Sequence, residues 1–261
     1  MILEYHRPTT IEEALALLAR KDPVTWPLGG GTHLNRPTTD LFAVVDLQAL
    51  TLNTFEQQGN TLILGSTVTL QSLLGKIQSP GEFGLLSDLG EAIRQEVSYN
   101  LRNSATIAGT LISADGRSAM TAGFLAMDAS LVLLPGEAEI DLGDLLPLRK
   151  ELLRGRLICK VKIPGQVRLV YESVARTPVD RPLVCAAMAT WPSGRIRLAM
   201  GGFGKAPSLA YDGTGSDGVE VAARSAYAEA GDEWASAEYR SEMAELLTLR
   251  CLDRIERFRQ E

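Results

Sequence analysis

Two stretches rich in small and hydroxyl-bearing residues constrain this chain more than any other feature. One is Leu28-Gly29-Gly30-Gly31-Thr32-His33-Leu34, and the other runs from Arg102 to Thr110 with a tail to Asp115. Neither has helical or strand periodicity, and small side chains leave backbone N–H groups free to point at an anion. Two such loops in one chain favour a single extended ligand whose diphosphate lies between them.

Each loop taken alone has a simpler explanation. A glycine run alone is more often a flexible turn than a ligand-binding loop. We prefer the ligand-binding interpretation here only because a second small-residue loop is present. The chain has neither GxxxxGK[ST], which a P-loop needs, nor a GxGxxG that opens a helix, which a Rossmann fold needs. The expected ligand site is therefore of another class.

Composition limits the remaining choices. The 261 residues are 45% hydrophobic and 22% charged, which is ordinary for a globular protein with room for two domains. A net charge of −6 argues against a nucleic-acid surface. No apolar run reaches the roughly 20 residues of a membrane helix, and the first residues lack the basic start of a signal peptide. We therefore expect a cytoplasmic protein with no membrane span and no nucleic-acid partner.

The three cysteines give no metal or disulfide pattern. Cys159, Cys185 and Cys251 lie far apart, each in an apolar segment, which favours reduced, buried thiols. The chain has two histidines and no CxxC motif, so we expect no protein-bound metal centre. No Ser/His/Asp or Cys/His arrangement identifies a catalytic residue, so catalytic residues stay unknown.

The first part of the chain reads as mixed helices and strands. A Thr10–Glu13 capping box followed by apolar positions at i, i+3, i+4 and i+7 predicts a helix over 10–20. Other apolar patterns predict strands at 24–28, 43–46, 61–65, 131–134 and 157–163, and helices near 70–77, 84–96 and 119–127. The pattern changes after Pro164.

Beyond Pro164 we expect antiparallel strands followed by helices. Residues 183–191 and 195–200 read as a hairpin around Pro192-Ser193-Gly194, and 212–218 reads as a loop. A final helix is predicted over about 236–258, with an apolar stripe of Met243, Leu247, Cys251, Ile255 and Phe258 that packs on its own domain.

At these loops the chain resembles a known family. Gly29-Gly30-Gly31-Thr32-His33-Leu34 and Arg102-Asn103-x-Ala105-Thr106-Ile107-x-Gly109 are similar to the two FAD diphosphate loops of molybdenum hydroxylase flavin subunits, the xanthine dehydrogenase and carbon monoxide dehydrogenase medium-subunit family. The similarity continues through 124–129, 175–187 and 200–207 and so spans nearly the whole chain.

The resemblance implies a fold and a cofactor. The implied class is α+β: a two-subdomain FAD-binding fold of the flavin-subunit (PCMH) type over 1–164, with subdomains of about 1–55 and 56–164, and a C-terminal α/β domain with antiparallel sheet and helices over 165–261. The implied cofactor is FAD. The implied FAD-binding residues are Leu28, Gly29, Gly30, Gly31, Thr32, His33, Leu34, Asn103, Thr106, Ile107, Gly109, Thr110 and Asp115.

It also implies a function. The expected protein is the FAD-binding electron-transfer subunit of a xanthine or carbon monoxide dehydrogenase-like oxidoreductase, with an iron–sulfur subunit, a molybdopterin subunit, and NAD or another electron acceptor as partners. Two alternatives stay open: a scaffold or assembly paralogue with weak or no flavin binding, and a stand-alone flavin reductase.

The chain departs from the family at several positions. Ala108 stands where the family usually has Gly, and a β-carbon there would obstruct close approach or a positive φ. Thr110 replaces an Asn, Ala119 replaces the Asp that helps hold the flavin's sugar chain, and an aromatic-Lys pair reads Tyr171-Glu172. These changes predict FAD binding weaker than in the family, strengthened by Ala108→Gly with Ala119→Asp.

Overall fold

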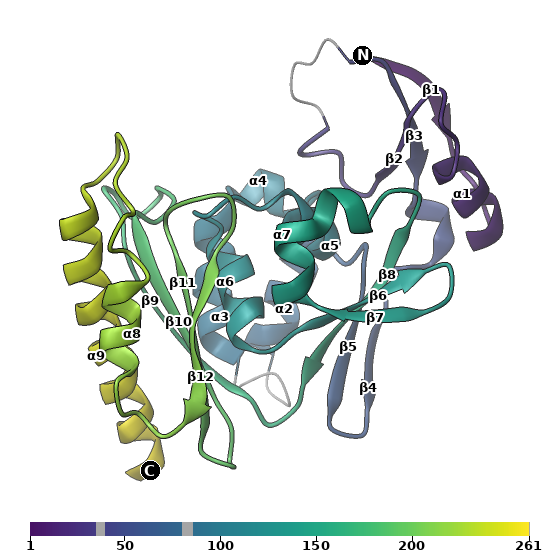
Figure 1. The fold of residues 1–261 in the computed structure, drawn as a ribbon. Helices are drawn as coiled ribbons and strands as arrows, with labels where there is room; N and C mark the ends of the chain where they lie inside the picture. Colours follow the sequence, from purple (N-terminus) through teal and green to yellow (C-terminus); the bar gives the residue numbers. More distant parts are fainter. Residues whose placement is uncertain (35–39, 80–85, 261) are drawn as a thin grey trace. The chain divides into compact units, whose positions relative to one another are not determined.

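The computed structural model describes residues 1–34, 40–79 and 86–260 and divides into two compact units (Figure 1). The first unit comprises Met1–Leu73, Tyr99–Ser113 and Ser130–Ile163, and the second comprises Leu74–Ser98, Ala114–Ala129 and Pro164–Glu261. Helix α2 (Leu70–Gln78) continues across the first boundary. Within the described ranges, no helix combines the length and the apolar character that crossing a bilayer requires.

A small parallel sheet opens the first unit. Its strand order is β1-β3-β2, with β1 (Ile2–His6), β2 (Thr25–Leu28) and β3 (Phe42–Asp46) all parallel. Helix α1 (Ile11–Leu18) packs its buried residues Ala14 and Leu18 with Val45 of β3. The predicted cap is confirmed, because the N–H of Glu13 donates to Thr10 Oγ1 at 3.2 Å. The predicted strands at 24–28 and 43–46 are also confirmed.

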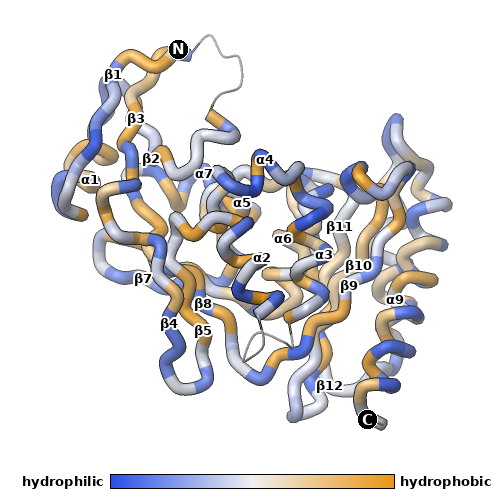
Figure 2. The backbone as a smooth tube through the Cα atoms, turned by 180° about the vertical axis from the view of Figure 1, so that it is seen from behind, coloured by the Kyte–Doolittle hydropathy of each residue, from blue (hydrophilic) through white to orange (hydrophobic). Residues whose placement is uncertain are grey.

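A five-stranded sheet forms the rest of this unit. Its order is β4-β5-β8-β6-β7, and β5 and β8 carry mostly hydrophobic residues (Figure 2). The strands of this sheet are β4 (Phe55–Gln58), β5 (Thr61–Gly65), β6 (Ser130–Leu134), β7 (Ala138–Asp141) and β8 (Leu157–Pro164). This part of the unit also contains the short helix η1 (Gln48–Leu50) and the helix α7 (Leu142–Leu152). The three strands predicted here are confirmed, and β7 and α7 occupy a region where no element was predicted.

The second small-residue stretch is not the irregular loop that its composition predicts. Helix α4 (Tyr99–Arg102) ends at the first residue of this stretch, and helix α5 (Ile107–Ser113) lies within it. Tertiary contacts form α5: Ile107 and Leu111 are fully buried, and the N–H of Ile107 donates to Val68 O at 2.9 Å. Burial of these two side chains outweighs the weak helical propensity of Gly109 and Thr110 between them.

The second unit is built on a four-stranded antiparallel sheet of order β12-β11-β10-β9. The predicted hairpin is confirmed as β10 (Val184–Thr190) and β11 (Arg195–Gly201). Figure 1 shows α8 and α9 on one face of this sheet and α3 and α6 on the other. The remaining elements are α3 (Ser87–Glu96), α6 (Ala119–Ala126), β9 (Arg168–Val174), β12 (Ser208–Thr214), α8 (Val219–Ser225) and α9 (Ala237–Gln260).

Helix α9 buries most of its predicted stripe, but Met243 is only partly buried and Phe258 is 37% exposed, so the prediction is wrong for Phe258. Leu247, Cys251 and Ile255 join the core formed by one face of β10 and β11, and Figure 2 shows hydrophobic and hydrophilic segments alternating along the helix. Two other predictions need correction. The predicted helix over 84–96 is found as Ser87–Glu96, and residues 84 and 85 lie outside the described residues. The predicted loop at 212–218 begins inside β12, because Arg195 and Arg197 hold Asp212 in an ion-pair network.

Candidate functional site

The glycine loop leaves the parallel sheet at a position suited to ligand binding. It follows β2, whose last residue Leu28 pairs with Asp46 at the end of β3, and the N–H of Leu47 donates to Leu28 O at 3.0 Å. Loops at the carboxyl ends of parallel strands are the usual ligand-binding edge of such sheets. Gly31 has φ +71°, which a residue with a side chain rarely adopts.

The two predicted loops touch each other. A β-carbon on Gly30 would lie 1.6 Å from Ser104 O, and one on Gly29 would lie 2.8 Å from Thr106 Oγ1. Backbone can approach backbone this closely only where the side chain is a hydrogen atom. The structure thus brings Gly29 and Gly30 together with Ser104–Thr106 inside the first unit.

The two loops differ in their free hydrogen-bond donors. In the second, the N–H groups of Ile107, Ala108, Gly109 and Thr110 donate to Val68 O, Ser66 O, Thr106 Oγ1 and Thr106 O, respectively. For the half-buried residues Gly29–Thr32, no such backbone N–H bond to another described residue is found. The first loop therefore leaves backbone N–H groups without protein partners among the described residues, whereas the N–H groups of the second are used to hold its own structure.

Side chains of the second loop are also occupied. Asn103 Nδ2 donates to Tyr99 O at 2.9 Å, and Thr110 Oγ1 donates to Thr106 O at 2.9 Å. Thr106 is buried, caps α5 through its hydroxyl and pairs with Thr69 across an isolated bridge. These contacts fix the loop geometry before any ligand is bound.

Ala108 lies in a conformation that differs from the expected one. It is the second residue of α5, it is 8% exposed, and its φ is not positive. The expectation that its β-carbon conflicts with a positive φ is therefore wrong, because the chain is helical at this position.

Asp115 belongs to the second unit and is already engaged. Arg181 Nη1 donates to Asp115 Oδ2 at 2.9 Å, and the N–H of Arg117 donates to Asp115 Oδ1 at 2.9 Å. Burial acts to raise the pKa of Asp115, but these bonds and the Arg181 charge hold it below its ordinary value. Next to it, Gly116 exchanges backbone hydrogen bonds with Gly202 and Gly204.

A carboxylate that the sequence analysis missed lies at the start of α6. Ala119, the first residue of this helix, is fully buried, and Glu96 Oε2 accepts bonds from Ser118 Oγ at 2.9 Å and the Met120 N–H at 3.0 Å. Burial raises the pKa of Glu96 against the opposing effects of these bonds and of Arg181. In the sequence, Glu96 could be recognised only as an acidic residue on the buried side of a predicted helix.

The thiols are inert in this arrangement. All three cysteines are unpaired and buried, as predicted, and burial raises the pKa of Cys185 to about 12. Among the described residues, no group of three or more His, Cys, Asp or Glu side chains converges as metal ligands would.

Comparison with known proteins identifies the family. A family model described as the FAD binding domain in molybdopterin dehydrogenase matches residues 1–166. The chain belongs to this family. It is therefore a FAD-binding subunit of the molybdenum hydroxylase type of oxidoreductase, as the loop resemblance implied.

Several known proteins resemble the chain over most of its length. The uncharacterized protein YgfM of Escherichia coli (strain K12) is 30% identical and covers 77% of this chain and 75% of its own. Caffeine dehydrogenase subunit beta of Pseudomonas sp. (strain CBB1) is 26% identical, with 96% and 94% coverage. The glyceraldehyde dehydrogenase medium chain of Sulfolobus acidocaldarius is also 26% identical, with 80% and 78% coverage.

Solved structures support the fold class. A chain of CO dehydrogenase from Oligotropha carboxidovorans is 24% identical, with a TM-score of 0.81 and 96% coverage of both chains. A chain of quinoline 2-oxidoreductase from Pseudomonas putida 86 is 21% identical, with a TM-score of 0.74 and 96% and 95% coverage. The predicted α+β flavin-subunit fold is therefore confirmed.

Proposed function

We propose that this FAD-binding subunit transfers electrons within a molybdenum hydroxylase-like complex in the cytoplasm. It would receive them from an iron–sulfur subunit served by a molybdopterin subunit and deliver them to NAD or another acceptor. Relatives called a medium chain and a subunit beta support a place in a multi-subunit enzyme. FAD, when bound, supplies chemistry that accepts a hydride and releases electrons singly or in pairs.

The contact between the two loops carries the proposed site. The backbone N–H groups of Gly29, Gly30, Gly31 and Thr32 would hold the FAD diphosphate, because they lack partners among the described residues. Leu28, His33 and Leu34 flank these donors in sequence, and Asn103, Thr106, Ile107, Gly109 and Thr110 would brace them. Asp115 lies in the second unit, where it is bound by Arg181, and its role in FAD binding stays a prediction from the family resemblance.

The protein's own task in this chemistry is to bind and orient the cofactor. A flavin needs no acid or base from the chain to exchange electrons. We therefore assign no catalytic residue, and the buried thiols take no part.

Substitution at Gly30 tests the site. A valine side chain would meet Ser104 O, which is backbone and cannot move away cheaply. We expect Gly30→Val to weaken FAD binding at least about a hundredfold, the loss of about two charge-assisted bonds. Fluorescence titration of FAD measures this. The matched control is Gly75→Ala in α2, where an added methyl meets nothing within 4 Å, and which should bind FAD as the wild type does.

Other outcomes would select the alternatives. If neither the wild type nor the control binds FAD, the chain is a scaffold or assembly paralogue. If Gly30→Val binds FAD normally, the cofactor lies elsewhere. NADH oxidation by the FAD-loaded chain with a dye and no partner subunit would favour a stand-alone reductase.

A further inference from the structure

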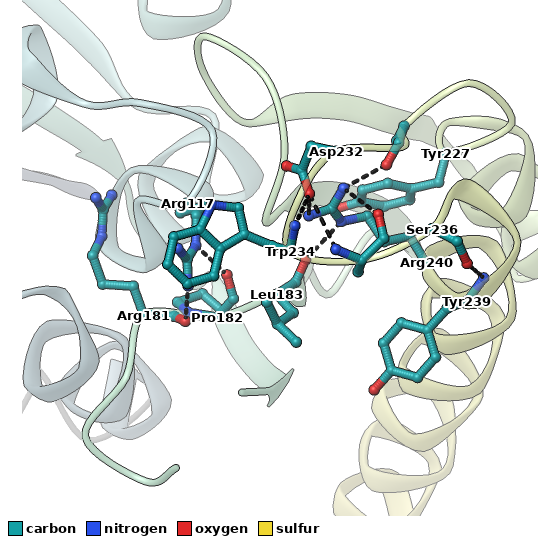
Figure 3. Close-up of polar contacts among 12 residues, drawn as sticks. Arg117, Arg181, Pro182, Leu183, Tyr227, Asp232, Trp234, Ser236, Tyr239 and Arg240 are labelled. Atoms are coloured by element: carbon teal, nitrogen blue, oxygen red, sulfur yellow. Dashed lines mark hydrogen bonds and ion pairs between the residues drawn. The ribbon is translucent and has the colours of Figure 1, made fainter. Parts of the chain in front are cut away.

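Trp234 lies on the second unit with two arginines over its ring. The guanidinium carbons of Arg117 and Arg176 are 4.5 and 4.8 Å from the ring centroid, and the residue remains 41% exposed. Figure 3 shows Arg117 and Trp234 together at the edge of the polar network that surrounds Arg240. We call Arg117, Arg176 and Trp234 the Trp234 cluster.

The loop that carries Trp234 is fixed in place. Asp232 Oδ1 accepts bonds from the N–H groups of Trp234 and Ala235 at 2.8 and 3.1 Å. Arg240, which is fully buried, binds the same oxygen at 2.8 Å and also donates to Ala230 O and Leu183 O (Figure 3). A rigid aromatic side chain loses little conformational entropy when a partner contacts it.

The two guanidiniums of the cluster form no close ion pair with a described carboxylate. Arg117 donates to Pro182 O at 3.0 Å and Arg181 O at 2.6 Å, and neither Arg117 nor Arg176 forms an ion pair with a described residue. By contrast, Arg181, Arg195 and Arg240 each pair with a carboxylate. Burial and the Arg181 charge lower the pKa of Arg117 more than the charges of Asp115 and Asp232 raise it, so its charge is held at a cost. An incoming oxyanion would offset that cost.

The surroundings favour a protein as the source of the oxyanion. Two guanidiniums already lie over the indole, so a nucleobase would have to displace one to stack there. Rigid Trp and Arg side chains are typical of residues that dominate protein interfaces.

We propose that the Trp234 cluster is a docking site for a carboxylate-bearing segment of a partner subunit. Arg117 and Arg176 bind the acidic side chains, and Trp234 holds the two guanidiniums in place. The proposal rests on the proposed function, which places the chain in a multi-subunit enzyme.

Association of the full chain with its co-expressed iron–sulfur and molybdopterin subunits tests the site. Arg117→Gln and Arg176→Gln should each weaken association about thirtyfold and reduce its sensitivity to salt. Arg176 is the cleaner position, because it is exposed and contacts only the Trp234 residue among the interactions found. Arg250→Gln, which removes an exposed arginine of α9, is the control and should change association less than about threefold.

Separate measurements distinguish this proposal from the proposed function. FAD affinity is measured on every variant; failure of the wild type to bind FAD would refute the proposed function, and failure of the wild type to associate with the partner subunits would refute the proposed complex and this site with it. Undiminished association of Arg176→Gln and Arg117→Gln would overturn only the docking site. The docking site would also be overturned if pyrophosphate or ADP quenched tryptophan fluorescence in the wild type but not in Arg117→Gln, because the cluster would then bind small phosphates.

Discussion

Glu96 illustrates how a single buried residue can determine pH behaviour. Its carboxyl group is enclosed at the start of α6 and has a raised pKa, with burial as the main cause. A carboxyl whose pKa is higher in the folded than in the unfolded state binds its proton more tightly when folded. Its contribution to stability is therefore present below the unfolded pKa of about 4.5 and is lost as pH rises through the folded pKa.

Glu96→Gln should remove this dependence. Glutamine keeps an acceptor for the Ser118 hydroxyl and the Met120 N–H but cannot ionise. We expect equal free energies of unfolding for the two proteins near pH 4, and a variant that is more stable above neutrality by about 1.4 kcal/mol for each unit of raised pKa. Urea unfolding of both proteins from pH 4 to 8 measures this difference in the free energy of unfolding. A variant less stable at every pH would show that the ionised carboxylate is needed.

Ala108 shows what a family resemblance alone could not decide. The departure from glycine is visible in the sequence, but the helical conformation at this position depends on contacts with Ser66 and Val68 from another segment. The sequence identified two stretches that the structure brings together, because glycine and threonine composition is a local signal. It could not show which loop keeps free N–H groups.

Ala108→Gly should therefore destabilise the protein without improving FAD binding. Glycine in a helix costs about 1 kcal/mol, and the lost buried methyl adds about 0.8 kcal/mol. Thermal unfolding and FAD titration of the single variant measure the two effects. Tighter FAD binding by the variant would instead show that the β-carbon obstructs the cofactor.

At the scale of elements, strands with clear alternation and long amphipathic helices were predictable. The hairpin of β10 and β11 and the stripe on α9 follow directly from periodicity. Short elements such as α5 and β7 were not, because their residues form structure only through packing with distant segments. The anchoring role of Arg240 was missed for the same reason: its partners are carbonyl oxygens whose positions no side-chain pattern reveals.

Arg240→Met should release the loop from Ala230 to Ala235. The substitution removes a fully buried charge that binds Asp232 and several carbonyl oxygens, leaving those acceptors unpaired. We expect a loss of about 3–5 kcal/mol in the free energy of unfolding. Arg224→Met, which breaks the exposed pair with Glu245, should cost less than about 1 kcal/mol. Similar losses in both variants would show that burial of Arg240 contributes no more than a surface ion pair.

At the scale of the whole molecule, the two units are interleaved along the chain. The sequence predicted domains of 1–164 and 165–261 from a change in local pattern. In the structure, α3 and α6 come from before residue 164 yet belong to the second unit. Local pattern cannot reveal this exchange, because membership of a unit is set by long-range packing.

This interleaving makes a prediction for the isolated C-terminal segment. Helix α6 is wholly buried and covers the sheet face where Cys185 lies, since a β-carbon on Gly201 would contact both Cys185 Sγ and Ala122 Cβ. Without α3 and α6 that face is exposed, so residues 165–261 alone should aggregate and show no sharp thermal transition. The full chain cut between Gly165 and Gln166, through an inserted protease site, should keep its circular dichroism spectrum and stay associated. A soluble, cooperatively unfolding 165–261 fragment would instead support an independent C-terminal domain, as the sequence division predicts.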